Sequence, residues 1–244
     1  MLGKAKIKYI QSLGQKKHRD ESGLFIAEGP KIVDEFLRTI PQQVQEVYAV
    51  KEWLNNERKS FGSVAFNEVS GEELERLSQL KTPHEVLAVV KKTSVASELN
   101  LKAKVTLVLD TIQDPGNLGT IIRIADWFGI TQIICSDECA DVYNPKVVQA
   151  TMGSIARVSV MYADLLQWLE EHKAIRIYAT TLEGKDISKM SRLQEGLILV
   201  GNESKGIDAK LLALANERIT IPKFGKAESL NAAVATGIIL SHLI

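Results

Sequence analysis

The sequence predicts an α/β fold, with a mostly parallel sheet covered by helices on both faces in its second half and a smaller α/β domain before it. Short β-branched apolar runs alternate with segments of helical periodicity, and the connections between them are short. The chain of 244 residues is 45% apolar and 25% charged, which suffices for two modest domains with hydrophobic cores. The formal net charge of zero argues against a polycation that coats nucleic acid, but it allows a local basic patch.

The first half opens with a basic segment, residues 1–20, whose Lys and Arg side chains interleave with apolar residues at roughly helical spacing. This pattern is typical either of a solvated helix face or of a surface that contacts phosphates. Pro30 is placed to begin a helix, and Ser70 with Glu73 forms a capping-box pattern. The expected strands are 24–27, 44–50, 64–66 and 86–91, and the expected helices are 31–38, 53–56 and 72–80.

The polar residues 93–104 are typical of a linker, which predicts domains at 1–92 and 105–244. In the second half the expected strands are 105–109, 132–135, 155–160, 175–180, 197–200 and 218–221, and the expected helices are 120–128, 146–151, 163–171, 209–215 and 229–243.

The stretch 105–129, VTLVLDTIQDPGNLGTIIRIADWFG, reads as a buried strand, a tight polar loop and a helix that ends at Gly129. Ligands collect at such loops, off the carboxyl ends of parallel strands. Because Arg123 lies about one helical turn beyond Gly119, we expect Asn117 and Arg123 to face the same crevice. Two further loops, 201–206 and 221–231, also follow buried-looking strands and combine glycines with polar groups.

Cys135 and Cys139 are four residues apart without a second Cys or His pair, so the spacing is not that of a zinc site. We expect free thiols in a reducing cytoplasm and no metal. The N-terminus lacks an apolar signal core, and no apolar run reaches membrane-spanning length. These features predict a cytoplasmic protein.

Three runs, NLGTIIR, LVGNESKGI and IP…ESLNAAVATGIIL, resemble in order the three sequence motifs of the SpoU/TrmH group of SPOUT-type RNA methyltransferases. The resemblance implies methyl transfer from S-adenosylmethionine to a ribose 2′-hydroxyl of ribosomal or transfer RNA, a homodimer, and a C-terminal trefoil knot. The run FIAEGPKIVDEFL is similar to part of the ribosomal-protein-like RNA-binding domain of members that modify ribosomal RNA. Ribosomal RNA is therefore favoured over transfer RNA.

The resemblance assigns residues to three roles. It implies a catalytic set of Asn117, Arg123, Glu203, Ser229 and Asn231. It implies cofactor contacts from Thr180, Leu182, Gly184, Gly201, Asn202, Gly206, Ile221 and Leu230. RNA contacts are expected from Lys16, Lys17, Arg19 and Glu28.

Within the catalytic set, Arg123 is expected to stabilise the developing alkoxide, because a guanidinium is never neutral enough to act as a base. Glu203 would hold Arg123 or order its own loop, and Asn117 would orient Arg123 or the ribose. More ordinary readings remain for two residues: a surface carboxylate for Glu203 and a helix N-cap for Ser229.

The sequence leaves two alternatives. A non-catalytic RNA-binding protein of the same fold would keep the basic segment but lack affinity for the cofactor. A dinucleotide-binding oxidoreductase is disfavoured, because no G-x-G-x-x-G follows an early strand and no acidic ribose partner lies at the expected distance.

Overall fold

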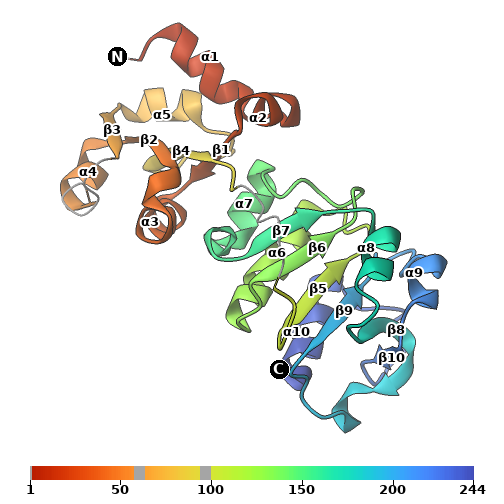
Figure 1. Ribbon diagram of the computed structural model, residues 1–244. Helices are drawn as coiled ribbons and strands as arrows, with labels where there is room; N and C mark the ends of the chain where they lie inside the picture. The colour runs from red at the N-terminus through yellow and green to blue at the C-terminus, as the bar shows by residue number, and fades with distance from the viewer. Residues whose placement is uncertain (1, 58–63, 94–99) are drawn as a thin grey trace. The chain divides into compact units, whose positions relative to one another are not determined.

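The computed structural model describes residues 2–57, 64–93 and 100–244. Contacts between residues divide the chain into two compact units (Figure 1). Unit 1 comprises Met1–Ser94 and Asp141–Ala156, and unit 2 comprises Val95–Ala140 and Arg157–Ile244. The predicted linker, residues 93–104, falls partly outside the described residues.

Unit 1 is built on a four-stranded mixed sheet in the order β1-β4-β2-β3. Strand β4 runs antiparallel to both β1 and β2, and β2 runs parallel to β3. The predicted capping box is present, because the Ser70 hydroxyl accepts the Glu73 N–H and the Glu73 carboxylate accepts the Ser70 N–H. The strands are β1 (Leu24–Glu28), β2 (Val44–Ala49), β3 (Ala65–Glu68) and β4 (Val86–Lys91), and the helices are α1 (Lys4–Ser12), α2 (Lys16–Ser22), α3 (Pro30–Thr39), α4 (Lys51–Glu57), α5 (Gly71–Leu77) and α7 (Pro145–Thr151).

The segment 141–156 follows two strands of unit 2 in sequence but packs within unit 1. Its first residue, Asp141, accepts a 2.5 Å hydrogen bond from Nη2 of Arg19, whose side chain is 2% exposed. Next to it, the Tyr143 ring lies 4.7 Å from the ring of Phe25 on β1. A buried guanidinium requires a carboxylate partner, and this segment supplies it.

Unit 2 contains a six-stranded sheet in the order β10-β8-β9-β5-β6-β7, in which every neighbouring pair is parallel. This confirms the predicted α/β class with a mostly parallel sheet. Helices α8 and α9 pack on one face, while α6 and α10 pack together on the other (Figure 1). The strands are β5 (Val105–Leu109), β6 (Gln132–Cys135), β7 (Ser159–Tyr162), β8 (Ile177–Asp186), β9 (Gly196–Val200) and β10 (Glu217–Thr220), and the helices are α6 (Pro115–Trp127), α8 (Leu165–Glu171), α9 (Ala209–Ala213) and α10 (Ala232–Leu243).

Helix α6 begins at Pro115, five residues earlier than predicted, so the expected loop through Asn117 and Gly119 is wrong. Asp114 is the N-cap, and its Oδ1 accepts the Asn117 N–H at 2.8 Å. Proline suits the first helical position, because it has no N–H to lose and its φ already fits a helix. Asn117 therefore lies in the first turn of a helix.

Two other predicted boundaries are corrected. The strand expected at 155–160 is wrong in its first part, since Ser154–Ala156 is a 3-10 turn and β7 begins at Ser159. Helix α10 begins at Ala232 with Asn231 as its N-cap, so Ser229 is not the cap. No helix among residues 2–57, 64–93 and 100–244 is long and apolar enough to cross a membrane.

Candidate active site

The three segments that the sequence singled out meet through a chain of side-chain hydrogen bonds at the carboxyl edge of the unit 2 sheet. Nδ2 of Asn231, at the start of α10, donates to Oδ1 of Asn117 on α6 at 2.8 Å. Nδ2 of Asn117 in turn donates to Oε1 of Glu203, in the loop after β9. Asn231 and Asn117 are 114 positions apart in the sequence, and Asn117 and Glu203 are 86 positions apart. The two hydrogen bonds fix these three residues against one another.

The direction of these hydrogen bonds is set by the cap of helix α10. Oδ1 of Asn231 accepts the N–H groups of Ala233 and Val234 at 3.0 and 3.2 Å, so the Asn231 amide must turn its NH₂ group towards Asn117. The Asn117 oxygen then faces that NH₂ group, which leaves the Asn117 NH₂ group for the carboxylate of Glu203. We refer to this chain, Asn231 to Asn117 to Glu203, as the amide chain.

The loop after β9, residues 201–206, is folded back on itself. Asn202 and Gly206 exchange backbone hydrogen bonds of 3.0 and 2.9 Å, and Asn202 Oδ1 accepts the N–H groups of Ser204 and Lys205. A Cβ on Gly201 would lie 2.5 Å from the carbonyl carbon and oxygen of Gly206, so only glycine fits at that position. The predicted cofactor residues Gly201, Asn202 and Gly206 thus shape one tight turn.

The turn after β5 contains two residues whose roles sequence reasoning missed. Asp110 is buried, and its Oδ2 accepts the N–H of Asp208 at 2.8 Å. Thr111 has φ 58°, a left-handed conformation that is strained for a β-branched residue. Nδ2 of Asn202 donates to the carbonyl of Thr111 at 2.9 Å and thereby holds this strained turn. The available signal was the position of Asp110, directly after a buried strand.

Arg123 lies on the exposed surface of α6, and within the described part of the chain it makes no hydrogen bond or ion pair. Residues six apart on a continuous α-helix are separated by about 9 Å along the axis and about 120° around it. The structure therefore does not bring Arg123 to Asn117, and Glu203 bonds Asn117 rather than Arg123. The expectation of one crevice shared by Asn117 and Arg123 is wrong for a single subunit.

The residues Thr180, Leu182 and Gly184 lie inside strand β8 rather than after a strand. The pairing of β8 with β10 jumps here, because Arg218 pairs with Ala179 while Ile219 pairs with Lys185. Residues 180–184 of β8 therefore have no paired residue on β10, and we call them the β8 excursion. A Cβ on Gly184 would lie 2.7 Å from the Arg218 carbonyl, so this excursion requires glycine where it approaches β10.

The segment 221–230 connects β10 to α10. Ile221 is half-buried, whereas Ser229 and Leu230 are exposed, so ordinary core packing does not explain Leu230. Thr220 Oγ1 donates to the carbonyl of Leu182 at 3.1 Å, which ties the start of the segment to the β8 excursion. Its end is tied to α6 by the amide chain.

Two thiols lie behind the β5–α6 turn. Cys139 Sγ accepts the N–H of Ile112 at 3.2 Å and donates to the carbonyl of Leu109 at 3.3 Å. A hydrogen bond with Cys139, together with burial, raises the pKa of the Cys135 thiol. Both cysteines are free and buried. Among the residues that the structure describes, no group of three or more His, Cys, Asp or Glu could hold a metal ion.

The four predicted RNA contacts separate into two surface residues and two interior residues. Lys16 and Lys17 are exposed on α2, where they face Asp20 and Glu21 one helical turn away. Arg19 is buried and donates to the carbonyls of Leu13 and Gly14 as well as to Asp141. The prediction that Arg19 contacts RNA is wrong, because its guanidinium is occupied inside unit 1.

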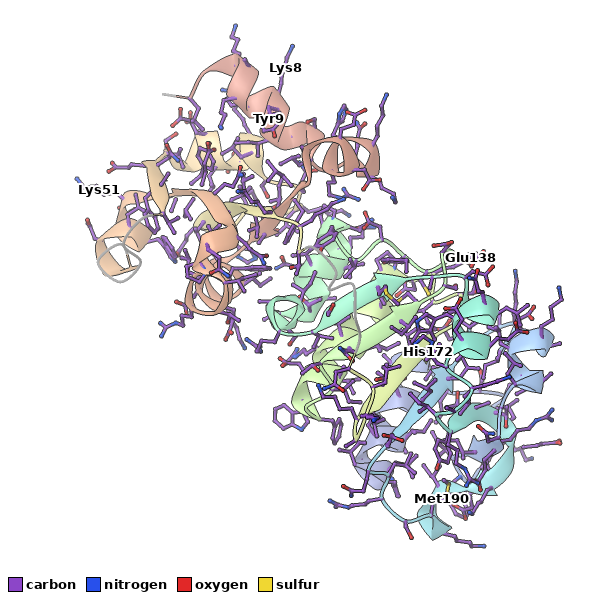
Figure 2. All side chains as sticks on the ribbon, viewed as in Figure 1. Lys8, Tyr9, Lys51, Glu138, His172 and Met190 are labelled. Carbon is purple, nitrogen blue, oxygen red and sulfur yellow. The ribbon has the colours of Figure 1, made fainter. Side chains whose placement is uncertain are left out.

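Glu28 is also in the interior, so its prediction as an RNA contact is wrong. Its Oε1 accepts the N–H of Gln79 at 2.8 Å, and its Oε2 accepts the hydroxyl of Ser78 at 2.5 Å. Burial raises the pKa of the Glu28 carboxyl, against the lowering effect of these hydrogen bonds. Lys8 in α1 belongs to the same basic segment, and it projects into solvent (Figure 2).

Comparison with known proteins identifies both parts of the chain. Residues 104–241 match the SpoU rRNA Methylase family, and residues 4–88 match the MRM3-like substrate binding domain. The chain is 32% identical to the 23S rRNA (guanosine(2553)-2'-O)-methyltransferase RlmP of Bacillus subtilis over 98% of this chain and 95% of that protein.

Solved structures agree with this similarity. An AdoMet-bound rRNA methyltransferase from Sinorhizobium meliloti is 31% identical with a TM-score of 0.86, over 100% of this chain and 95% of that one. The SpoU methyltransferase AviRb from Streptomyces viridochromogenes, in complex with the cofactor AdoMet, is 25% identical with a TM-score of 0.85, over 99% and 97% of the two chains.

Proposed function

Because this chain belongs to the SpoU rRNA methylase family, we propose that it transfers a methyl group from S-adenosylmethionine to a ribose 2′-hydroxyl of RNA. The observation that carries the proposal is the amide chain, which fixes all three motif segments of unit 2 at one edge of the sheet. Ribosomal RNA is the favoured substrate, since RlmP is named for 23S rRNA and residues 4–88 match a substrate binding domain. Ribosomal RNA as substrate favours action in the cytoplasm.

The residues present fit S-adenosylmethionine. Residues 180–184 leave the β8–β10 ladder, and Thr220 donates to the Leu182 carbonyl shortly before the exposed residues 223–230, so backbone groups of both segments are available to an adenosine. We assign the cofactor contacts to Thr180, Leu182, Gly184, Gly201, Asn202, Gly206, Ile221 and Leu230. When bound, S-adenosylmethionine supplies a methyl group already activated on a sulfonium.

Methyl transfer requires this chain to align the 2′-oxygen and to stabilise the charge that develops as its proton leaves. Arg123 is suited to this task, because it is exposed, permanently charged and able to form a bidentate contact with the alkoxide and a neighbouring phosphate. Asn117, Glu203 and Asn231 hold the three motif segments in the orientation that the reaction needs. Ser229 is exposed two residues before Asn231, and among the described residues its hydroxyl makes no hydrogen bond. The proton leaves to water or phosphate.

A homodimer would bring Arg123 to the amide chain of the partner subunit. This arrangement is supported by the separation of Arg123 from Asn117 within one chain. It is also supported by two exposed apolar side chains on the packed pair α6 and α10, namely Trp127, which is 86% exposed, and Val234, which is 52% exposed. Their burial against a second copy would remove a large apolar area from water.

The exchange of subunits tests this arrangement. Arg123→Ala chains and Asn231→Asp chains, each impaired and each measured alone first, are mixed and allowed to exchange. If Arg123 acts across the dimer, the mixture recovers about a quarter of wild-type activity. Random exchange gives about half of the dimers one chain of each kind, and each such dimer has one intact site out of two. If Arg123 acts within its own subunit, every site retains one lesion and no activity returns.

For the rest of the chain we infer an RNA substrate-binding domain at residues 1–92, a linker at 93–104 and a catalytic domain at 105–244. Lys16 and Lys17 are available for phosphate, because exposed ion pairs within one helix are weak and easily exchanged.

A C-terminal trefoil knot is supported by the path of the chain, which leaves the edge strand β10 and returns to pack α10 against α6, next to the central strand β5.

The decisive experiment is transfer of labelled methyl from S-adenosylmethionine to ribosomal RNA from cells lacking this gene, followed by nucleoside analysis. We expect a 2′-O-methylated nucleoside with the wild-type protein and none with Arg123→Ala. A methylated base would overturn the assignment of the ribose. Absence of transfer to both free RNA and assembled subunits, together with absence of cofactor binding, would identify a non-catalytic RNA-binding protein.

A further inference from the structure

The segment between β10 and α10 carries a feature that the motif residues do not use. Phe224 is 96% exposed, and it lies in a run, residues 223–230, in which every residue is exposed. Lys223 precedes it and Lys226 follows it closely. An aromatic ring held in water between two cations has the composition of a nucleic-acid contact, since rings stack on bases and cations attract phosphates.

The two lysines are free to act. Within the described residues, neither Lys223 nor Lys226 makes a hydrogen bond or an ion pair. Two lysines of unit 2 are paired instead: Lys185 lies 2.9 Å from Glu217, and Lys189 lies 4.0 Å from Asp186. A free ammonium exchanges its counterions for a phosphate without first breaking an ion pair.

The ends of the segment place Phe224 beside the reaction site. Thr220 is tied to the β8 excursion at Leu182, and Asn231 is tied to Asn117 by the amide chain. Four residues of extended chain span at most about 14 Å, so Phe224 remains within that distance of the Thr220 backbone. The ring therefore stands at the rim of the proposed methyl-transfer site rather than on a remote surface.

We propose that Phe224 is a positioning residue that stacks on an unpaired nucleobase of the RNA substrate, while Lys223 and Lys226 contact its phosphates. The inference rests on the proposed function and adds to it a requirement for a single-stranded target. A base held in a duplex presents no free face to the ring, whereas a base in a loop or bulge does. Phe224 thus helps to determine which nucleotides can reach the site.

The test compares three substitutions of Phe224 on unmodified ribosomal RNA transcribed in vitro. Phe224→Ala should raise the KM for RNA by about tenfold, since the loss of one base–aromatic stack is of that order, with kcat changed less. Phe224→Trp should restore the wild-type KM because it keeps a stacking face. Phe224→Leu should behave like Phe224→Ala, because it keeps apolar volume but has no aromatic face.

The lysines are tested through salt dependence. Lys223→Gln and Lys226→Gln should each reduce the slope of log affinity against log salt by about 0.7, the value for one phosphate contact on a single strand. Lys173→Gln is the matched control, because Lys173 is also exposed but lies between α8 and the first residue of β8, at the amino edge of the parallel sheet. Its slope should equal that of the wild-type protein.

Several results would overturn the proposal. Full activity of Phe224→Leu would mean that apolar contact suffices, and a parallel loss of cofactor affinity in Phe224→Ala would place the ring on the cofactor. A halved mass of Phe224→Ala in light scattering would place the ring at a subunit contact.

Binding of the same RNA is measured separately by filter retention. A wild-type protein that binds RNA without methylating it would contradict the proposed function, while the affinities of the three variants would still decide the role of the ring. If the wild-type protein neither binds nor methylates RNA, the stacking role is refuted as well.

Discussion

The amide chain makes a prediction in which activity and stability separate. In Asn231→Asp the new carboxylate still accepts the two N–H groups of α10, so the helix keeps its cap and gains a favourable charge at its N-terminus, worth about 0.3–1 kcal/mol. The variant cannot donate to Asn117, however. Whichever way the Asn117 amide turns, one of its neighbours, Asp at 231 or Glu203, presents an oxygen to its oxygen.

The expected cost follows from that unpaired contact. We expect the motif segments to move apart in the resting variant, so the cost of about 1–3 kcal/mol for a polar atom without a partner arises when the site is assembled for the reaction, which corresponds to about 5- to 150-fold in kcat/KM. Asn231→Ala loses both the cap and the donor, so its free energy of unfolding should also fall by about 1 kcal/mol. Methyl transfer to ribosomal RNA measures the first quantity, and urea unfolding measures the second.

A second substitution should repair the first. In the double variant Asn231→Asp with Glu203→Gln, the Asn117 NH₂ group can face the aspartate while its oxygen accepts from the new glutamine. The chain is then complete in the reverse direction. We expect the double variant to recover most of the activity that Asn231→Asp lost, and Glu203→Gln alone to lose little, because its amide oxygen still accepts from Asn117. Near-normal activity of Asn231→Asp, or no recovery in the double variant, would refute the reasoning.

Three further predictions concern Gly201 in the loop after β9, the buried Glu28 of unit 1, and Arg123. Gly201→Ala places a Cβ against backbone and should weaken S-adenosylmethionine binding in calorimetry and cost about 1–3 kcal/mol of stability, whereas Gly71→Ala, which has open space, should leave that affinity unchanged. The raised pKa of Glu28 means that the folded state binds more protons than the unfolded state above the ordinary value of 4.5. The free energy of unfolding should therefore fall as pH rises towards the folded pKa. Glu28→Gln should remove that fall in urea titrations at several pH values, because its amide oxygen can still accept the Gln79 N–H and its NH₂ group can donate to the Ser78 hydroxyl. Arg123→Lys should lose most of the methyl-transfer rate, because it keeps the charge but not the planar guanidinium that can make two parallel hydrogen bonds. A rate close to wild type would contradict the bidentate role.

Much of unit 2 could be predicted because its information is local. Buried strands such as β5 and β9 are continuous apolar runs, and the motifs that follow them identify the family from the sequence alone. The family match over residues 104–241 confirms that identification. The error at Asn117 arose from composition, since proline and two glycines within five residues indicate a turn. Asp114 followed by Pro115 was the signal of a helix start, with a cap and a proline at the first position.

The interior positions of Arg19 and Glu28 could not be predicted, because their partners are distant in sequence. Arg19 pairs with Asp141, 122 residues away, and Glu28 accepts from Gln79, 51 residues away. A basic residue within a basic segment is ordinarily solvated, and nothing local marks the one whose partner lies in a later part of the chain. Asp110 also has a distant partner, the backbone of Asp208 98 residues away, and its position directly after a buried strand was the one local signal for it.

The proposed site combines neutral amides for positioning with a charged group for reaction, and the physical reason is specific to each task. Asn117 and Asn231 each supply both a donor and an acceptor. The backbone N–H groups of α10 therefore set the orientation of both amides, up to the hydrogen bond with Glu203, without adding charge. Arg123 remains free of any intrasubunit partner among the described residues, so its charge is not already neutralised when a phosphate or an alkoxide arrives. If Glu203 held Arg123, which was one of the two roles expected for it, the reacting oxygen would have to compete with a carboxylate for the same guanidinium. The observed arrangement avoids that competition, and it is the arrangement that electrostatic stabilisation of an anionic transition state requires.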